Sequence, residues 1–385
     1  MPGRRGIGTV IVLLLSLGVF VCLSVLTVEG QSVAAASSVP GRQGASSNDV
    51  QAEAELQRGV DLTSRGRFQE AIPHLLQARQ ARIGDEYAAD FNLALCYVAT
   101  GQNEEAILIL RSLLNAGHGT AAVYNLQAQA LLGVSGPQQA LEAFQRSADL
   151  DPKNEKLYLF LADSSMDYHT YDFGLRVVGV GLQHLPKSAR LHYERGILLS
   201  FVDQPDEARV DLKLASELAP GTTISFLAEA QAGLLDANMP AAVRAARNGL
   251  QKEPADYVLL TILGKALIRE GVSPGQAEFD EAQTALEKAA AAHPDYAVCQ
   301  LALGELYLIA NRLNEAIAEL EKARRLAPDN PSVYSLLGAA YRRAGSLQDA
   351  EKMFAVLAGL NREQAARYKL DPPDHKGSYI GSRRQ

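Results

Sequence analysis

Between about residues 52 and 364, large apolar, small and polar residues recur at helical spacing, and the pattern returns every 34 residues. Ala140 and Phe144 followed by Pro152 show it clearly, and Ala208 with Pro220 repeats it two periods later. The remaining copies of these positions are Ala71/Leu75, Ala106/Leu110, Gly174/Val178/Pro186, Ala242/Pro254, Ala282/Leu286/Pro294, Ala316/Leu320/Pro328 and Ala350/Phe354.

A second set of positions follows the same period. It consists of a Leu-Gly-like pair with a Tyr or Leu three residues later, as in Leu303-Gly304 with Tyr307 and in Leu337-Gly338 with Tyr341. Together the two sets define nine units, which begin near residues 52, 87, 121, 155, 189, 223, 257, 297 and 331.

Each unit is predicted to be a helix, a short turn and a second helix with facing apolar sides. Small residues such as Gly304 and Ala316 allow the two helices to approach closely, and a bulky residue there would cost roughly 1–3 kcal/mol. The recurring prolines end the second helix. Because no unit can bury its own apolar face, the units are expected to stack on their neighbours.

These residues and spacings resemble those of the tetratricopeptide repeat, in which a Leu-Gly pair, a Tyr, an Ala, a Phe and a Pro recur in about 34 residues. The resemblance covers residues 51–364 and implies an all-α, right-handed α-solenoid of about nine helix–turn–helix units. It also implies that the first helix of each unit lines a concave groove for a protein or peptide. The sequence departs from the family pattern in having no Trp, and in having Glu229 where an apolar residue is usual.

The seventh unit is six residues longer than the period, since 40 residues separate Ala242 from Ala282. The additional residues, 271–276, lie between the two predicted helices and are expected to protrude as a loop. Two interpretations remain: a tolerated surface insertion, or a loop that contributes to specificity.

The repeat fades after Ala358 into a polar stretch that is expected to continue as a helix and to cap the last unit. Residues 365–385 are therefore assigned to a C-terminal cap and a disordered tail, which contains Pro372, Pro373 and Gly377.

The N-terminal segment has the features of an export signal. Arg4 and Arg5 precede 22 uncharged, mostly apolar residues, 7–28, and a stretch rich in small residues follows. Residues 1–30 are thus predicted to be a signal peptide or, since the run is long enough to span a bilayer, a signal anchor that attaches the protein to the membrane. Residues 31–50 are predicted to be a flexible linker. Both alternatives predict an exported protein that lies in the periplasm or elsewhere outside the cytoplasm. A cleaved signal peptide would leave it soluble, and a signal anchor would leave it attached to the membrane.

Composition narrows the possible chemistry. A formal net charge of −7 and the lack of a basic stripe argue against nucleic-acid binding. The three cysteines, Cys22, Cys96 and Cys299, are too few and scattered for a disulfide framework or a zinc site, so no metal or cofactor is expected.

The residues that suggest catalysis have simpler explanations. Gly179 and Gly181 resemble part of a phosphate-binding loop, but they fall within a predicted second helix, where small residues serve packing. Asp163 and Asp167 share one helix face and form a possible acid–base pair, which leaves open a hydrolase or transferase as a remote alternative. The favoured prediction is a protein that is not an enzyme.

The predicted binding surface lies on the first helices. Arg190, Tyr193 and Phe201 combine a cation with two aromatic rings, the residue types that dominate interface energetics. Arg342 and Arg343 provide positive charge for an acidic or C-terminal group. The full set of groove candidates is Phe91, Asn125, Gln129, Lys156, Asp163, Asp167, Arg190, Tyr193, Phe201, Lys265, Arg269, Arg342 and Arg343. The sequence therefore predicts a protein-interaction scaffold or adaptor, with a membrane-tethered structural spacer as the alternative.

Overall fold

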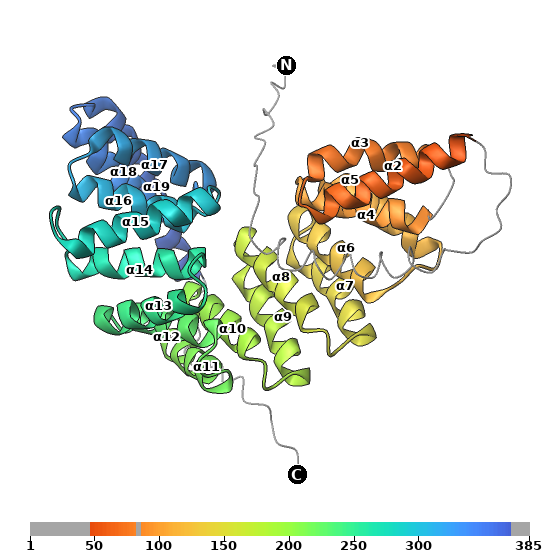
Figure 1. The fold of residues 1–385 in the computed structure, drawn as a ribbon, viewed down its shortest axis with the longest axis horizontal. Coiled ribbons are helices and arrows are strands. Elements are labelled where there is room, and N and C mark those ends of the chain that lie inside the picture. The colour runs from red at the N-terminus through yellow and green to blue at the C-terminus, as the bar shows by residue number, and fades with distance from the viewer. Residues whose placement is uncertain (1–46, 82–85, 371–385) are drawn as a thin grey trace, which may run out of the picture. The chain divides into compact units, whose positions relative to one another are not determined.

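The computed structural model describes residues 47–81 and 86–370, and these ranges contain 18 α-helices and no strand. Figure 1 shows the chain as a succession of helical hairpins. The predicted all-α class is therefore confirmed. The first helices of the hairpins are α2 (Ser47–Ser64), α4 (Glu86–Ala99), α6 (Ala121–Val134), α8 (Glu155–Asp167), α10 (Ala189–Phe201), α12 (Thr223–Leu235), α14 (Tyr257–Glu270), α16 (Ala297–Ile309) and α18 (Pro331–Arg343). The second helices are α3 (Phe68–Ala81), α5 (Asn103–Asn115), α7 (Pro137–Leu150), α9 (Tyr171–His184), α11 (Pro205–Leu218), α13 (Met239–Lys252), α15 (Ala277–Ala292), α17 (Leu313–Leu326) and α19 (Leu347–Leu370).

The chain divides into two compact parts, Met1–Pro254 and Ala255–Gln385. The N-terminal part contains α2 to α13, and the C-terminal part contains α14 to α19. Within each part, a helix packs mainly on its hairpin partner and on the next hairpin. This nearest-neighbour packing is the arrangement expected of a solenoid.

Small residues set the distance between the two helices of a hairpin. A Cβ added to Gly304 would lie 2.6 Å from Cγ of Leu320, and one added to Gly338 would lie 2.6 Å from a ring carbon of Phe354. Larger side chains at these positions would therefore push the second helix away. The reciprocal alanines on the second helices have no exposed surface; they are Ala71, Ala106, Ala140, Ala208, Ala242, Ala282 and Ala316.

Several of the proline turns that join successive hairpins share one hydrogen bond. The Tyr158 hydroxyl donates to the carbonyl oxygen of Pro152 at 2.9 Å, and the Gln300 amide donates to that of Pro294 at 2.9 Å. The donor lies six residues after the proline in both cases, early in a first helix. The same bond joins Tyr334 to Pro328 at 2.6 Å.

One helix boundary differs from the prediction, and a second follows it. Helix α2 begins at Ser47, inside the predicted linker, and Asp49 in its first turn is favourable near a helix N-terminus. Helix α19 continues without a break to Leu370, so the predicted cap is an extension of the last second helix.

The six-residue insertion is a short turn between α14 and α15. Gly271 adopts a left-handed conformation with φ of 91° and ends α14. The amide of Ser273 donates to the side-chain oxygen of Gln276 at 2.7 Å, and Val272 is buried. The insertion is thus anchored at one apolar residue.

The predicted signal or anchor (1–30), most of the linker and the C-terminal tail lie outside the described residues. Among the helices that are described, none combines the length and the hydropathy needed to cross a membrane.

Candidate functional site

The first helices form the tighter side of each part. In the N-terminal part α2, α4, α6, α8, α10 and α12 pack each on the next, and in the C-terminal part α14 packs on α16 and α16 on α18. Among the second helices of the described residues, only α7 and α9 pack on each other to an extent similar to that of neighbouring first helices. First helices are therefore closer together than second helices, which makes their layer the inner face of each part. Every residue of the predicted binding surface lies on a first helix.

The inner face of α4 and α6 is largely closed by packing. Phe91, Asn125 and Gln129 are all buried, with at most 7% of their surface exposed. The Asn125 amide donates to the carbonyl oxygen of Leu157 on α8 at 3.0 Å, which ties two first helices together. The side-chain oxygens of Asn125 and Gln129 have no hydrogen-bond partner among the described residues. Asn125 thus ties adjacent repeats together, and Phe91 and Gln129 offer almost no surface to a ligand.

The accessible part of the N-terminal inner face is on α8 and α10. Lys156 and Arg190 are exposed, and Asp163 is half-buried, whereas Tyr193 is only 9% exposed. The side chain of Asp167 lies outside the described residues. The structure therefore places both Asp163 and Asp167 on α8, as predicted, and describes the side chain of the first alone.

Phe201 is the most exposed aromatic side chain of the predicted surface. It is 51% exposed and lies at the end of α10, where its ring stacks on Tyr171 with centroids 5.0 Å apart. The Tyr171 hydroxyl lies 2.9 Å from Nδ1 of His169. Two stacked rings with one open face provide rigid apolar contact area of the kind that interfaces favour.

A half-buried carboxyl lies on α10, the helix that carries Phe201. Glu194 on α10 occupies a repeat position that holds Phe160 in the preceding repeat and Ile262 two repeats later. Burial raises the pKa of Glu194 to about 7, and the positive charge of Arg190 opposes this shift only in part.

In the C-terminal part, charged groups gather on α14 and α16. Burial and the neighbouring Arg269 lower the pKa of Lys265, while burial raises the pKa of Glu305. Each of the two groups partly offsets the shift of the other. Lys265 and Glu305 therefore lie within electrostatic range but do not form a direct ion pair.

The two predicted arginines at the end of α18 take different directions. Arg342 lies over the ring of Phe354 on α19, 5.7 Å from its centroid, and so turns toward the second helices. Arg343 reaches the end of α16, where it donates to the carbonyl oxygen of Leu308 at 2.8 Å and to the side chain of Asn311 at 3.0 Å. Only Arg343 therefore contributes its charge to the inner face.

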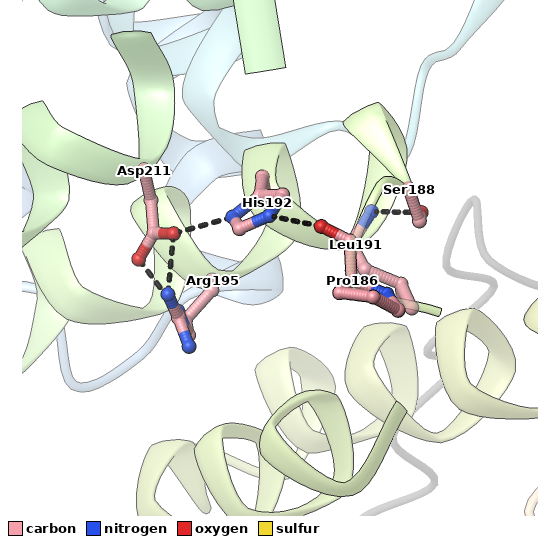
Figure 2. A network of polar contacts seen from close by, with 6 residues as sticks. All are labelled: Pro186, Ser188, Leu191, His192, Arg195 and Asp211. Carbon is pink, nitrogen blue, oxygen red and sulfur yellow. Dashed lines mark hydrogen bonds and ion pairs between the residues drawn. The ribbon is translucent and has the colours of Figure 1, made fainter. Parts of the chain in front are cut away.

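One buried polar network was missed by sequence reasoning. Figure 2 shows Asp211 on α11 between two donors from α10. Arg195 donates to both carboxylate oxygens at 2.6 Å, and Nδ1 of His192 lies 2.7 Å from Oδ1. On its other side, Nε2 of His192 lies 3.2 Å from the carbonyl oxygen of Pro186. His192 thus provides the recurring turn contact and also links that turn to α11.

The chemistry of this network is structural. Asp211 is 2% and His192 is 7% exposed, so neither offers a surface to a substrate. A carbonyl oxygen only accepts, so Nε2 of His192 must donate to Pro186. The carboxylate of Asp211 accepts both hydrogen bonds of the Arg195 fork, so its charge is paired within the network. The sequence signal was available, since the preceding repeat has Leu161 and Val177 where this one has Arg195 and Asp211.

A cleft of about 470 Å³ lies between α11 and α13 over α12. Its origin is in the irregular sixth repeat, where Glu229 and Gly233 replace the leucines found at 263 and 267 in the next repeat. The hydroxyl of Ser216 donates to Glu229 at 2.7 Å. Acidic and basic residues both line the cleft; the lining side chains include Lys213, Glu217, Glu229, Asp236 and Arg244.

Three comparisons with known proteins bear on these repeats. The family model described as tetratricopeptide repeat matches residues 62–130, 275–338 and 308–370. A TPR repeat-containing protein from Pseudomonas aeruginosa is 30% identical over 203 residues, which is 52% of this chain and 30% of that protein. The chain thus spans less than a third of that relative's length.

Similar solved structures are also helical repeat proteins. A tetratricopeptide repeat protein from Parabacteroides merdae has a TM-score of 0.45 at 17% identity, covering 75% of this chain and 98% of its own. A TPR protein from Thermus thermophilus has a TM-score of 0.41 at 20% identity, covering 48% and 98%. At these TM-scores the similarity bears on no functional question. The matched segments of this chain are thus similar to the tetratricopeptide repeat, both by the family model and by the Pseudomonas relative.

Proposed function

We propose that this protein is a non-catalytic scaffold that binds a segment of a partner protein on the inner face of its first helices. The observation that carries the proposal is the stacked pair of Phe201 and Tyr171. Phe201 keeps half of its surface exposed while its ring is held against Tyr171. A large exposed ring on a rigid helix end is costly to leave in water and is suited to a partner's side chain.

The family supports the same class of function, because proteins built from these repeats bind other proteins. Stacked helical repeats create extended concave surfaces that suit the binding of another protein. Among the described residues, no group of three or more His, Cys, Asp or Glu side chains is arranged to hold a metal ion.

We further propose that the scaffold works outside the cytoplasm. The apolar run 7–28 and the two arginines before it support this location. Mass spectrometry of the mature N-terminus from native cells tests it: a start after residue 28 indicates cleavage, and an intact N-terminus in the membrane fraction indicates an anchor. An intact chain recovered from the cytosol would contradict export.

Photo-crosslinking tests the binding face. A benzoylphenylalanine is placed at position 201 on α10 or at position 210 on α11. The native residues Phe201 and Val210 are similarly exposed, at 51% and 58%. We expect position 201 to crosslink a defined protein that position 210 does not, and Phe201→Ala to weaken binding of that purified protein.

Equal crosslinking from both positions would contradict the inner-face assignment. An identical affinity of Phe201→Ala and wild type for the purified protein would do the same. The control variant Val210→Ala removes a similarly exposed apolar side chain from the second-helix side.

A further inference from the structure

We propose that the cleft between α11 and α13 binds a small zwitterion, a molecule that carries an ammonium group and a carboxylate on a short aliphatic chain. This inference goes beyond the proposed function, because the walls of the cleft are two second helices and its occupant is a small molecule. It depends on two charged groups of the cleft, Glu229 on α12 and Arg244 on α13.

The cleft has the size and the lining of a small-molecule site. Its volume of about 470 Å³ lies within the range of about 300–1,000 Å³ that such sites occupy. Leu212 and Ala245 line it with at most 4% of their surface exposed, and Gly233 contributes no side chain to fill it. An aliphatic chain in the cleft therefore meets apolar surface.

Most charged groups of the lining already have a partner of opposite charge. Lys213 lies 3.7 Å from Glu217, one turn further along α11. Asp236 pairs with Arg209, which is also on α11. These groups are neutralised within the protein and do not decide the charge of a ligand.

Two charged groups of the lining remain unpaired. Arg244 is exposed and forms no ion pair or hydrogen bond within the part of the chain that the structure describes. Glu229 accepts a hydrogen bond from the neutral hydroxyl of Ser216 at 2.7 Å, and no cation among the described residues pairs with it. Glu229 and Arg244 do not pair with each other either. The cleft thus presents one anion and one cation that are separated from each other.

A zwitterion matches both groups at once. An ammonium group has three donors and no acceptor, so it suits the carboxylate of Glu229. A guanidinium binds a carboxylate with two parallel N–H donors, so the carboxylate of the ligand suits Arg244. Asn248 also lines the cleft, four residues after Arg244 and on the same face of α13, where its amide is a further donor. A ligand with a single charge would leave one of the two protein groups unmatched.

Isothermal titration calorimetry with the full chain at low ionic strength tests the inference. The probes are glycine, β-alanine, 4-aminobutanoate, 5-aminopentanoate and 6-aminohexanoate, in which the two charges are moved apart one methylene at a time. Butylamine and butanoate carry one charge each and are the controls. We expect one chain length to bind at least about fivefold more tightly than either control, and its affinity to fall with added salt.

Three variants locate the site. Glu229→Gln and Arg244→Gln each remove one charge with little change in size, and each is expected to weaken the best zwitterion about fivefold. Glu229→Gln is expected to leave the affinity for butanoate unchanged, and Arg244→Gln that for butylamine. Arg176→Gln is the matched control, since Arg176 is exposed on α9 outside the cleft. Arg176 and Arg244 each lie 21 residues after the predicted start of their repeats, at 155 and 223.

Three outcomes would each overturn the inference. They are a control ligand that binds as tightly as the best zwitterion, no binding of any probe at millimolar concentration, and an equal loss in Arg176→Gln and Arg244→Gln. If a cleft variant fails to fold, the comparison among ligands on the wild-type chain still decides. The scaffold proposal is tested separately, by crosslinking at Phe201.

Discussion

His192 donates from Nε2 to the carbonyl oxygen of Pro186, 3.2 Å away, across the turn that joins α9 to α10. The same six-residue contact is made by Gln300 to Pro294. A histidine and a glutamine therefore perform one structural task in two repeats. Only the histidine side chain has a second nitrogen, and this atom, Nδ1, lies 2.7 Å from Oδ1 of Asp211.

Substitution of His192 separates these two tasks. His192→Leu removes both contacts and is expected to destabilise the protein by about 2–4 kcal/mol, since it leaves the carbonyl of Pro186 and the buried carboxylate of Asp211 each short of a donor. His192→Gln restores a donor for Pro186, as Gln300 does in its repeat, and is expected to lose less. Urea unfolding followed by circular dichroism measures the difference. Equal losses would show that the turn contact contributes nothing measurable.

The Gly179 and Gly181 pair distinguishes a packing role from a ligand loop. A Cβ at position 181 would lie 2.9 Å from the ring of buried Tyr158, whereas one at position 179 would meet nothing within 4 Å. Gly181→Ala is expected to destabilise the protein by about 1–3 kcal/mol. Gly179→Ala is expected to stabilise it by about 0.5–1 kcal/mol, because alanine favours a helix interior. Thermal unfolding tests both, and a shift of the same sign for the two variants would contradict the packing explanation.

Glu194 predicts a pH dependence of stability. Its pKa rises from 4.5 to about 7 on folding, chiefly through burial, so the folded state holds the proton more tightly than the unfolded state. The contribution of protonated Glu194 to the free energy of unfolding is fully present below pH 4.5 and is lost as the pH rises toward 7. Between about pH 5 and about pH 8, the wild type is expected to lose about 1–3 kcal/mol more than Glu194→Gln. Parallel pH profiles for the two proteins would show that the carboxyl is not desolvated.

The two buried cysteines are expected to be unreactive. Burial raises the pKa of Cys96 to about 12 and that of Cys299 to about 11, which leaves almost no thiolate at neutral pH. Alkylation with iodoacetamide at neutral pH, followed by peptide mapping, is expected to modify neither thiol in the folded protein and both in urea. Rapid labelling of Cys96 without denaturant would show that its hairpin opens readily.

Much of the fold could be predicted from the sequence because the repeat carries its own packing rules. Gly304 predicts close approach of a second helix, and the structure places Leu320 against it. The period of 34 gives the residues at which first helices begin, including Ala121, Glu155 and Ala189. Local residue size and spacing are sufficient for these features, since each contact lies within one hairpin.

The inner face was less predictable because exposure depends on adjacent repeats. Phe91 and Asn125 were predicted to line an open groove on the first helices, yet both are buried. Arg342 and Arg343 are neighbours in sequence but turn to different layers, according to the rings and carbonyls within reach. The network around Asp211 joins residues 16 and 19 positions apart and becomes visible only when repeats are aligned with one another.

The recurring turn contact has a mechanical consequence. Tyr158, His192, Gln300 and Tyr334 each tie a proline turn to the helix that follows, whereas Phe226 occupies this position after Pro220 and has no donor to offer. Stiffness therefore varies along the stack. Under a pulling or bending load we expect the joint between α11 and α12 to yield before the tied joint between α9 and α10.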